Sequence, residues 1–391
     1  MTPFRCVVLM LLALVSSWTV SPVAAQTMPH AADGSAAMPD DWLFASKGPA
    51  WWYQMKPSTQ VKMLDTRNAT KAEQQVIDKA NNMMSQYPIK AIALIDGDKV
   101  VYSDYNAPAG PMSTIYGASM GKTITGIMVG QAICAGKLKM ETKADELIPE
   151  LKGKQLGATT VRDLLRMSSG TKHENADGNM FTPAQVPLWD RGQVNLLDVI
   201  QEDRNSTVER GVFSDYKPGE AFSYKNSNPA ALGMMIRRAT GMTYAEWFQS
   251  TVAEPMGAAE MGLVVQDKQG EGLAEGGVRM KMEDWVRFAV WVRKATKEKS
   301  CFGDYMRQAT KTQIANGPAK GQRKSGALFA GYGYLTWTDN EVAPDSFWAS
   351  GYGGQRIGWF NDSDRIIIVF SSVENWMAQL YALGKAWDNA R

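Results

Sequence analysis

The sequence predicts an α/β sheet domain that carries an inserted, mainly helical domain. Runs rich in β-branched and aromatic residues lie toward both ends of the chain, whereas the middle third has helical periodicity. We therefore expect one antiparallel sheet, assembled from both ends of the chain and flanked by helices. The expected sheet domain comprises residues 41–115 and 271–391, and the helical domain comprises residues 116–270.

The first part of the predicted sheet domain is a helix followed by a hairpin. Thr70 and Glu73 form a capping-box pattern, which predicts a helix that runs to about Met84. Residues 90–95 and 99–103 resemble strands and flank an Asp-Gly-Asp turn, so they predict a β-hairpin.

The remaining elements follow from the spacing of apolar residues. Between Met120 and Ile133 this spacing predicts an amphipathic helix that Gly136 can end. Further helices are expected at 161–167 and 230–239. Strands are expected at 328–337, 347–360 and 366–373, followed by a closing helix from residue 375.

The N-terminus predicts export. Arg5 precedes an apolar run over residues 7–15, and small residues at 23–25 suit a cleavage site. We expect residues 1–25 to be a signal peptide and residues 26–40 a flexible leader. The mature protein is expected to be periplasmic or secreted, without stable membrane insertion. A short membrane anchor is the alternative.

Composition limits the classes of function. The 391 residues are 45% hydrophobic and 21% charged, which is typical of a soluble globular enzyme. A formal net charge of +2 argues for neither a nucleic-acid nor an anionic membrane partner. The histidines are His30 and His173, and no His or Cys cluster exists, so neither a metal nor an organic cofactor is implied. Cys134 and Cys301 would remain after export, and the sequence does not say whether they pair.

The pattern Ser-x-x-Lys occurs three times, beginning at Ser119, Ser169 and Ser214. Nucleophilic chemistry needs the serine on the first turn of a helix, where the lysine lies beside it and the helix N-terminus favours developing negative charge. Ser169 runs into Gly170 in a polar loop, and the third motif is followed by proline. We therefore predict that Ser119 is the nucleophile and that Lys122 activates it.

Residues 117–121 also fit the Gly-x-Ser-x-Gly elbow of α/β-hydrolases. That fold needs an acid and then a histidine after the serine. His173 is the sole later histidine, and it lies in the helical middle of the chain. A Ser-His-Asp site is therefore the alternative interpretation, with lysine as the preferred local base.

A second motif, Tyr224-Lys225-Asn226, is the sole Tyr-x-Asn of the chain. Further phrases occur on both sides of this motif, at 161–170, 217–219, 254–257 and 276–278, in the order in which the family has them. Together they resemble the β-lactamase-related serine hydrolases, which include class C β-lactamases and penicillin-binding proteins. The motifs are most similar to those of the 6-aminohexanoate-dimer (nylon-oligomer) hydrolases.

This resemblance implies a β-lactamase/transpeptidase-like fold with the site in the cleft between the two domains. Ser119 would form an acyl-enzyme, Lys122 would share its proton, and Tyr224 would act as base and later as acid. Asn226 would orient the base network and the substrate amide. Further candidates for substrate contact are Tyr116, His173 and Glu174, with Trp189 and Asp190 as weaker ones.

A glycine-rich stretch stands where β-lactamases have Lys-Thr-Gly. Gly351 matches the glycine, and Ala349 replaces the cation that would bind a substrate carboxylate. Arg356 is near enough in sequence to supply a cation instead. Ser350 and Gly351 are expected to contact substrate. The N–H groups expected to form an oxyanion hole are those of Ser119 and Tyr352.

Together these features predict an exported serine hydrolase that cleaves a small-molecule amide or ester through an acyl-enzyme. One alternative is a β-lactamase or D-Ala-D-Ala carboxypeptidase, against which Ala349 argues. Another is a non-catalytic binding protein of the same fold, against which the intact Ser119, Lys122 and Tyr224 argue. The oligomeric state is left open by the sequence.

Overall fold

The computed structural model describes residues 36–171, 181, 184–185, 188–189, 191–201, 217–316 and 328–391. The predicted signal peptide and residues 26–35 of the predicted leader lie outside this part of the chain. So do His30, His173, Glu174, Asp190 and Ser214. Packed contacts begin within the predicted leader, because Met38 is buried and its N–H donates to the Ser372 carbonyl at 2.7 Å.

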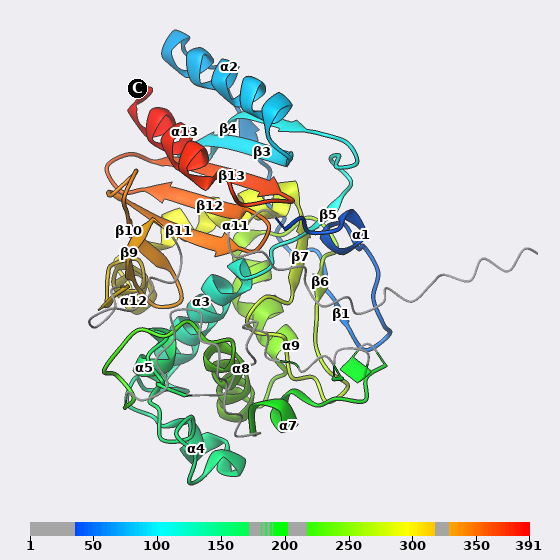
Figure 1. Cartoon of the computed structure of the whole chain (residues 1–391), viewed down its shortest axis with the longest axis vertical. Coiled ribbons are helices and arrows are strands. Elements are labelled where there is room, and N and C mark those ends of the chain that lie inside the picture. Colours follow the sequence, from blue (N-terminus) through cyan, green and yellow to red (C-terminus); the bar gives the residue numbers. More distant parts are fainter. Residues whose placement is uncertain are drawn as a thin grey trace, which may run out of the picture.

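A nine-stranded sheet joins the two ends of the chain (Figure 1). Strand β3 (Ile89–Asp96) pairs antiparallel with β13 (Arg365–Ser371), which confirms that a sheet is assembled from both ends. The expectation that it is wholly antiparallel is wrong, because the two-residue β2 (Asp65–Thr66) pairs parallel with β4 (Lys99–Tyr105). The strand order is β2-β4-β3-β13-β12-β11-β10-β9-β8. The other strands are β2 (Asp65–Thr66), β4 (Lys99–Tyr105), β8 (Ile314–Ala315), β9 (Phe329–Tyr332), β10 (Trp337–Asn340), β11 (Ser346–Gly351) and β12 (Gln355–Phe360).

A second sheet of four short strands was not predicted. Its order is β1 (Tyr53–Gln54), β6 (Leu263–Val264), β7 (Val278–Lys281) and β5 (Thr114–Tyr116). Strands of two to four residues are too short to show a period in the sequence. This sheet matters for the site, because β5 leads directly into the helix that begins after Ser119.

Helices cover both faces of the large sheet (Figure 1). One face packs against α2 (Lys71–Gln86) and α13 (Met377–Asn389). The other packs against α3 (Met120–Cys134) and α11 (Met282–Ala295), with α12 (Cys301–Ala309) beside α3. The other α-helices described are α1 (Asp40–Leu43), α4 (Ala144–Leu147), α5 (Val161–Leu165), α7 (Leu196–Gln201), α8 (Ser227–Thr240), α9 (Tyr244–Phe248) and α10 (Glu254–Met256).

The local predictions near the N-terminus are confirmed. Thr70 and Glu73 cap α2 reciprocally, and β3 and β4 form the expected antiparallel hairpin. The prediction that α3 is amphipathic is wrong, since twelve of its residues are buried between the sheet, α8 and α12. The prediction of a strand at 328–337 is also incomplete, because the chain turns there to form the β9–β10 hairpin. Helices α11 and α12 lie within the expected sheet domain, in a stretch for which the sequence predicted no individual element.

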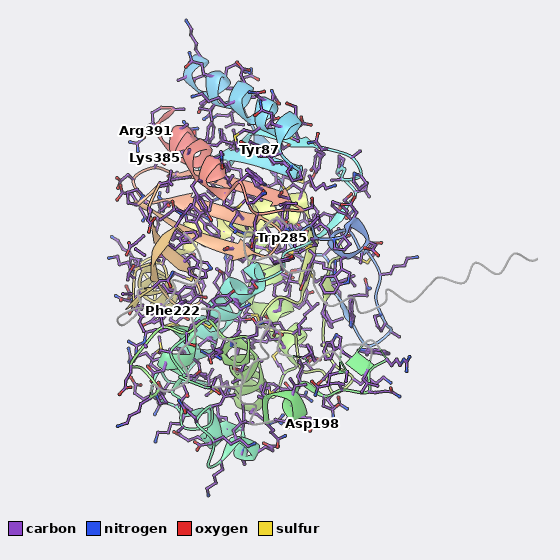
Figure 2. All side chains as sticks on the ribbon, in the orientation of Figure 1. Tyr87, Asp198, Phe222, Trp285, Lys385 and Arg391 are labelled. Atoms are coloured by element: carbon purple, nitrogen blue, oxygen red, sulfur yellow. A yellow bond between two sulfur atoms is a disulfide. The ribbon has the colours of Figure 1, made fainter. Side chains whose placement is uncertain are left out.

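Side chains fill the space between these layers (Figure 2). Trp285 of α11 lies near the centre of that view, is fully buried, and donates from its indole N–H to the Ile115 carbonyl at 3.2 Å. A Cβ at Gly117 would lie 2.5 Å from its ring, so glycine is required where β5 approaches the core. The core thereby fixes the path of the chain into α3. The division at residues 116 and 270 into two domains stays a prediction.

No helix within the described ranges is both long and apolar enough to span a bilayer. Cys134, at the end of α3, and Cys301, at the start of α12, form a disulfide with a Cα–Cα distance of 5.8 Å. This crosslink fastens the helix that follows Ser119 to a helix 167 residues further along the chain. The pairing that the sequence left open is thus present in the structure.

Candidate active site

The turn between β5 and α3 presents Ser119. Ala118 has a φ of +46°, which is rare for a residue other than glycine, and Ser119 follows as the N-cap of α3. Ser119 is half-buried. A Cβ at Gly121 would lie 2.8 Å from the Gly276 Cα, so the first turn of α3 packs directly on the backbone of that loop. Close backbone packing therefore sets where the Ser119 hydroxyl points.

Lys122 lies directly beside Ser119. Its Nζ is 2.8 Å from the Ser119 Oγ and 3.0 Å from the Glu275 carbonyl oxygen. The side chain is 2% exposed, and no carboxylate of the described residues forms an ion pair with it. A hydroxyl and a carbonyl, rather than an acid, thus hold the amine in place. This i, i+3 pair on the first helical turn is the geometry that the sequence pattern predicted.

Tyr224 contacts Lys122 through its aromatic ring. The Lys122 Nζ lies 4.9 Å from the centroid of the Tyr224 ring. That ring stacks on Trp337 with a centroid distance of 5.4 Å and an interplanar angle of 22°. Within the described ranges, no hydrogen bond joins the Tyr224 hydroxyl to another residue. Asn226 lies close by as the N-cap of α8, where it is half-buried.

The end of β11 packs against the chain just before Ser119. A Cβ at Gly351 would lie 2.4 Å from the Gly117 carbonyl oxygen and 3.1 Å from the Ala118 Cβ. Tyr352 follows, and the turn continues through Gly353 and Gly354, which both have positive φ. The close approach that we expected for the glycine-rich strand is therefore present, and it brings the Tyr352 backbone near residues 117–118.

Side chains of β11 alternate between the two faces of the sheet. Ala349 is fully buried and lies on the same face as Gly351, toward α3. Ser350 lies on the opposite face, paired in register with Arg356 and next to Trp348, whose ring contacts Tyr381 of α13. The side chain of Ser350 therefore starts from the face that α13 covers.

Arg356 does not supply the missing cation. Its guanidinium is buried, donates to the Gly351 carbonyl, and forms an ion pair with Glu374 at 3.3 Å. It also donates to the Tyr381 hydroxyl at 3.2 Å. Because these partners belong to the α13 side of the sheet, Arg356 stabilises the end of β11. The suggestion that it binds a substrate carboxylate is therefore wrong.

Tyr116 forms a buried wall behind the nucleophile. Burial raises its pKa to about 12, a shift that Arg279 opposes and Glu275 reinforces. The Arg279 guanidinium lies 4.3 Å from the centroid of the Tyr116 ring, and the Trp42 ring packs edge-on against it at 5.9 Å. Burial therefore disfavours the phenolate form of Tyr116, whose hydroxyl can donate a hydrogen bond.

The other described candidates, Ser169 for the nucleophile and Trp189 for substrate contact, pack against residues outside the Ser119–Lys122 site. Ser169 is fully buried and donates to the Asn228 Oδ1 at 2.6 Å, which is a structural contact. Trp189 packs on Phe181 with a centroid distance of 5.1 Å. Lys172, His173, Glu174, Asp190 and Ser214 lie outside the described residues.

Three features of the site escaped sequence reasoning: the strained Ala118, the carbonyl of Glu275 and the ring of Trp337. A backbone carbonyl carries no sequence signal. The glycines that follow Glu275 entered the sequence analysis only as one of the phrases that resemble the family. Trp337 was assigned to a strand, and nothing in its spacing indicated the face on which Tyr224 packs.

Comparison with known proteins decides the family. The model of the β-lactamase family matches residues 76–386. The chain belongs to the β-lactamase family. It is 24% identical over 276 residues to the 6-aminohexanoate-dimer hydrolase of Paenarthrobacter ureafaciens, an alignment that covers 68% of each protein. It is 26% identical to a β-lactamase of Psychrobacter immobilis over 50% of this chain and 60% of that protein.

Solved structures share the fold of this β-lactamase-family chain. One carries the name 6-aminohexanoate-dimer hydrolase, from Bacillus anthracis; it superposes with a TM-score of 0.71 at 19% identity and covers 93% of this chain and 98% of its own. Another is an octameric penicillin-binding protein homologue from Pyrococcus abyssi, with a TM-score of 0.59 at 18% identity over 80% of this chain and 75% of its own. The predicted β-lactamase/transpeptidase-like fold is confirmed.

Proposed function

We propose that this β-lactamase-family hydrolase cleaves a small amide or ester through an acyl-enzyme on Ser119. The observation that carries the proposal is the 2.8 Å contact between the Lys122 Nζ and the Ser119 Oγ on the first turn of α3. A nucleophile and a base within hydrogen-bond reach, with the base fixed by a third group, is the arrangement of an activated serine. Here the third group is the Glu275 carbonyl.

In the proposed reaction, the Lys122 amine accepts the proton of the Ser119 hydroxyl, whose oxygen lies 2.8 Å away. As the Ser119 oxygen bonds to the acyl carbon, its proton moves to Lys122. Tyr224, whose ring adjoins Lys122, gives its phenol proton to the leaving amine or alkoxide and is reprotonated from Lys122. Water then attacks the acyl-enzyme with the same groups acting in reverse, which releases the acid and restores Ser119.

Backbone N–H groups are proposed to stabilise the charge on the acyl oxygen. The Ser119 N–H lies at the start of α3, and the Tyr352 N–H follows Gly351, whose Cα approaches Gly117 closely. Preorganised donors of this kind favour the tetrahedral intermediate. We assign Asn226 and Gly351 to substrate contact, and the same assignment for Ser350, Tyr116, His173 and Glu174 stays a prediction.

Two observations favour a substrate without a carboxylate next to the scissile bond. Ala349 occupies the place of the strand cation, and Arg356 is committed to Glu374 and the Gly351 carbonyl. The name of the Paenarthrobacter relative, 6-aminohexanoate-dimer hydrolase, also favours a linear amide over a β-lactam.

We also propose that the protein is exported. The signal-like sequence at residues 1–25 supports this, as does the disulfide between Cys134 and Cys301, because disulfides persist in oxidising compartments. N-terminal sequencing of exported material should find a start near Gln26. An intact Met1 in a membrane fraction would favour an anchor instead.

A hydrolysis panel tests the proposed activity. The wild-type protein and Ser119→Ala are compared on short acyl esters, linear amide dimers, a chromogenic cephalosporin and D-Ala-D-Ala peptides. We expect turnover of an ester or linear amide that Ser119→Ala abolishes and that Ser169→Ala largely retains. Activity that survives Ser119→Ala, or equal losses in both variants, would contradict the proposal.

A further inference from the structure

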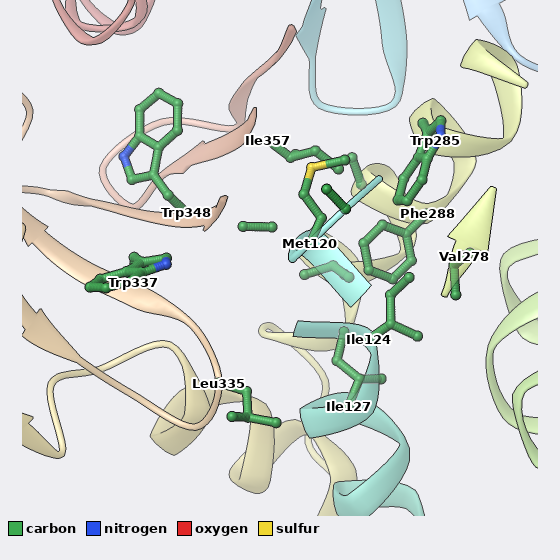
Figure 3. Packing of buried hydrophobic residues seen from close by; sticks show 14 of the residues in the cluster. Met120, Ile124, Ile127, Val278, Trp285, Phe288, Leu335, Trp337, Trp348 and Ile357 are labelled. Carbon is green, nitrogen blue, oxygen red and sulfur yellow. The ribbon is translucent and has the colours of Figure 1, made fainter. Parts of the chain in front are cut away.

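The hairpin of β9 and β10 contacts both parts of the proposed proton-transfer group. On one side, its turn at residues 333–336 packs on α3, the helix that carries Lys122 and follows Ser119. On the other side, Trp337 at the start of β10 stacks on Tyr224. Figure 3 labels Leu335 and Trp337 of this hairpin, together with Ile124 and Ile127 of α3. The hairpin is thus a physical link between the nucleophile helix and the tyrosine.

The turn is fixed to α3 by backbone contacts. The Thr123 hydroxyl, one residue after Lys122, donates to the Leu335 carbonyl at 2.9 Å. A Cβ at Gly126 would lie 2.8 Å from the Tyr334 carbonyl oxygen and 3.2 Å from the Leu335 Cβ, so the turn packs directly against the helix at this glycine. Leu335 has a φ of +53°, and its N–H donates to the Leu165 carbonyl at 2.8 Å. Hydrogen bonds to both its N–H and its carbonyl hold Leu335 in this unfavourable conformation, so the surrounding structure fixes the position of the turn.

The position of Tyr224 depends on the same hairpin. Tyr224 precedes α8 in a segment without helix or strand. Its ring stacks on Trp337 and meets the Tyr332 ring edge-on, with a centroid distance of 6.4 Å. Trp337 is itself 6% exposed and packs edge-on against Phe222 at 5.8 Å. A planar, buried indole therefore sets the plane of the phenol ring beside Lys122.

We propose that Trp337 is a positioning residue for the reaction. It fixes the ring plane of Tyr224 so that the phenol oxygen reaches the leaving group, and the turn at 333–336 keeps this ring in register with Lys122. The inference rests on the proposed proton-transfer role of Tyr224. It requires no contact between Trp337 and the substrate.

The test compares Trp337→Leu with Trp337→Phe in the full mature protein. Misplacing a reacting group by about 1 Å can cost about 100-fold in rate, so Trp337→Leu should lower kcat for an amide or ester by that order with little change in KM. Trp337→Phe keeps a flat ring and should retain most of kcat. The rate at which a fluorophosphonate labels Ser119 should fall far less than kcat in Trp337→Leu. Labelling needs Lys122 to take the serine proton, but it does not need Tyr224, because fluoride leaves without being protonated.

Trp359→Leu is the matched control. Trp359 is likewise a buried tryptophan of the large sheet, where it stacks on Phe347 and donates to the Ala289 carbonyl at 2.8 Å. This variant should lose thermal stability but keep kcat. The inference is overturned if Trp337→Leu keeps its kcat, if Trp337→Phe loses as much as Trp337→Leu, or if labelling falls as far as turnover. A wild-type protein that is not labelled would instead remove the proposed function itself.

Discussion

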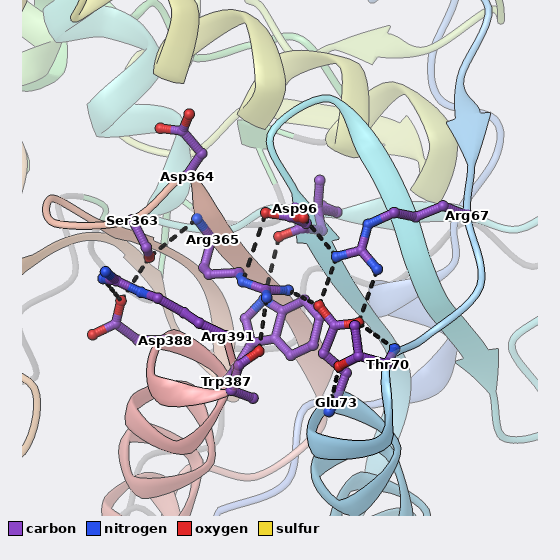
Figure 4. A network of polar contacts seen from close by, with 12 residues as sticks. Arg67, Thr70, Glu73, Asp96, Ser363, Asp364, Arg365, Trp387, Asp388 and Arg391 are labelled. Carbon is purple, nitrogen blue, oxygen red and sulfur yellow. Dashed lines mark hydrogen bonds and ion pairs between the residues drawn. The ribbon is translucent and has the colours of Figure 1, made fainter.

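Two buried groups of polar side chains in this protein serve different ends. Near the chain termini, Glu73 is fully buried and contacts both Arg67 and Arg365, which also reach Asp96 (Figure 4). Around Ser119, by contrast, Lys122 is nearly as buried but contacts only a hydroxyl, a carbonyl and an aromatic ring among the described residues. In the first group each charged side chain has an oppositely charged partner, whereas in the second no described carboxylate pairs with Lys122.

Buried charged side chains therefore stabilise the fold in one group and suit proton transfer in the other. The Glu73 group joins α2, β3 and β13, and the Arg365 guanidinium also lies 4.2 Å from the centroid of the Trp387 ring of α13. It thereby fastens N-terminal and C-terminal elements together. A lysine without an acid partner among the described residues adds no such link, and in the proposed reaction it accepts the proton of Ser119.

The largest expected effect comes from removing the amine at the site. Lys122→Met should lower kcat/KM by about 10²- to 10⁴-fold, because general-base assistance is lost. Stability should change by less than about 1.5 kcal/mol, since a side chain of similar shape fills the space. Steady-state kinetics and urea unfolding measure the two effects. Near-normal activity in a folded Lys122→Met protein would contradict the proposed role of Lys122 in proton transfer.

Removing the buried acid should give the opposite pattern. Glu73→Gln leaves Arg67 and Arg365 without their shared carboxylate, and breaking a buried ion pair costs about 3 to 5 kcal/mol. The free energy of unfolding should fall by that order, while kcat at a temperature below the transition stays unchanged. A drop in kcat without loss of stability would show that the two groups are not separate.

The lack of a strand cation predicts a smaller effect on substrate choice. A charge-assisted hydrogen bond contributes about 1.5 to 3 kcal/mol, so penicillins and cephalosporins should show kcat/KM values about ten- to a hundredfold below those of small neutral esters. Arg356 cannot restore the contact while it binds Glu374. Penicillin hydrolysis as efficient as that of neutral esters would contradict this account.

Acid should weaken the Glu73 group gradually. The hydrogen bond from Arg67 lowers the pKa of Glu73 to about 2; burial opposes this shift, and the Thr70 amide and Arg365 reinforce it. A carboxyl with a depressed pKa contributes its stabilisation above its unfolded value of 4.5, and that contribution is lost as the pH falls toward 2. Unfolding midpoints between pH 6 and pH 2 should therefore fall less for Glu73→Gln than for the wild-type protein. Parallel pH profiles would contradict the assignment.

Sequence reasoning succeeded where chemistry is local in the chain. The Ser119–Lys122 pair is set by helical spacing, and the Thr70–Glu73 cap and the β3–β4 hairpin are set by short motifs. It failed where tertiary contacts decide. The burial of α3 on all sides and the stacking of Trp337 on Tyr224 depend on segments far apart in the chain. The face on which Ser350 lies depends on the packing of α13, which its own strand does not reveal.

Mass spectrometry of the protein, first intact and then digested, can detect the proposed acyl-enzyme. A slow ester substrate is mixed with the wild-type protein and quenched in acid, and the protein is then digested. We predict one added acyl group, carried by the peptide that contains Ser119 and absent from Ser119→Ala. Turnover without any covalent adduct, or an adduct on a peptide that lacks Ser119, would contradict the account.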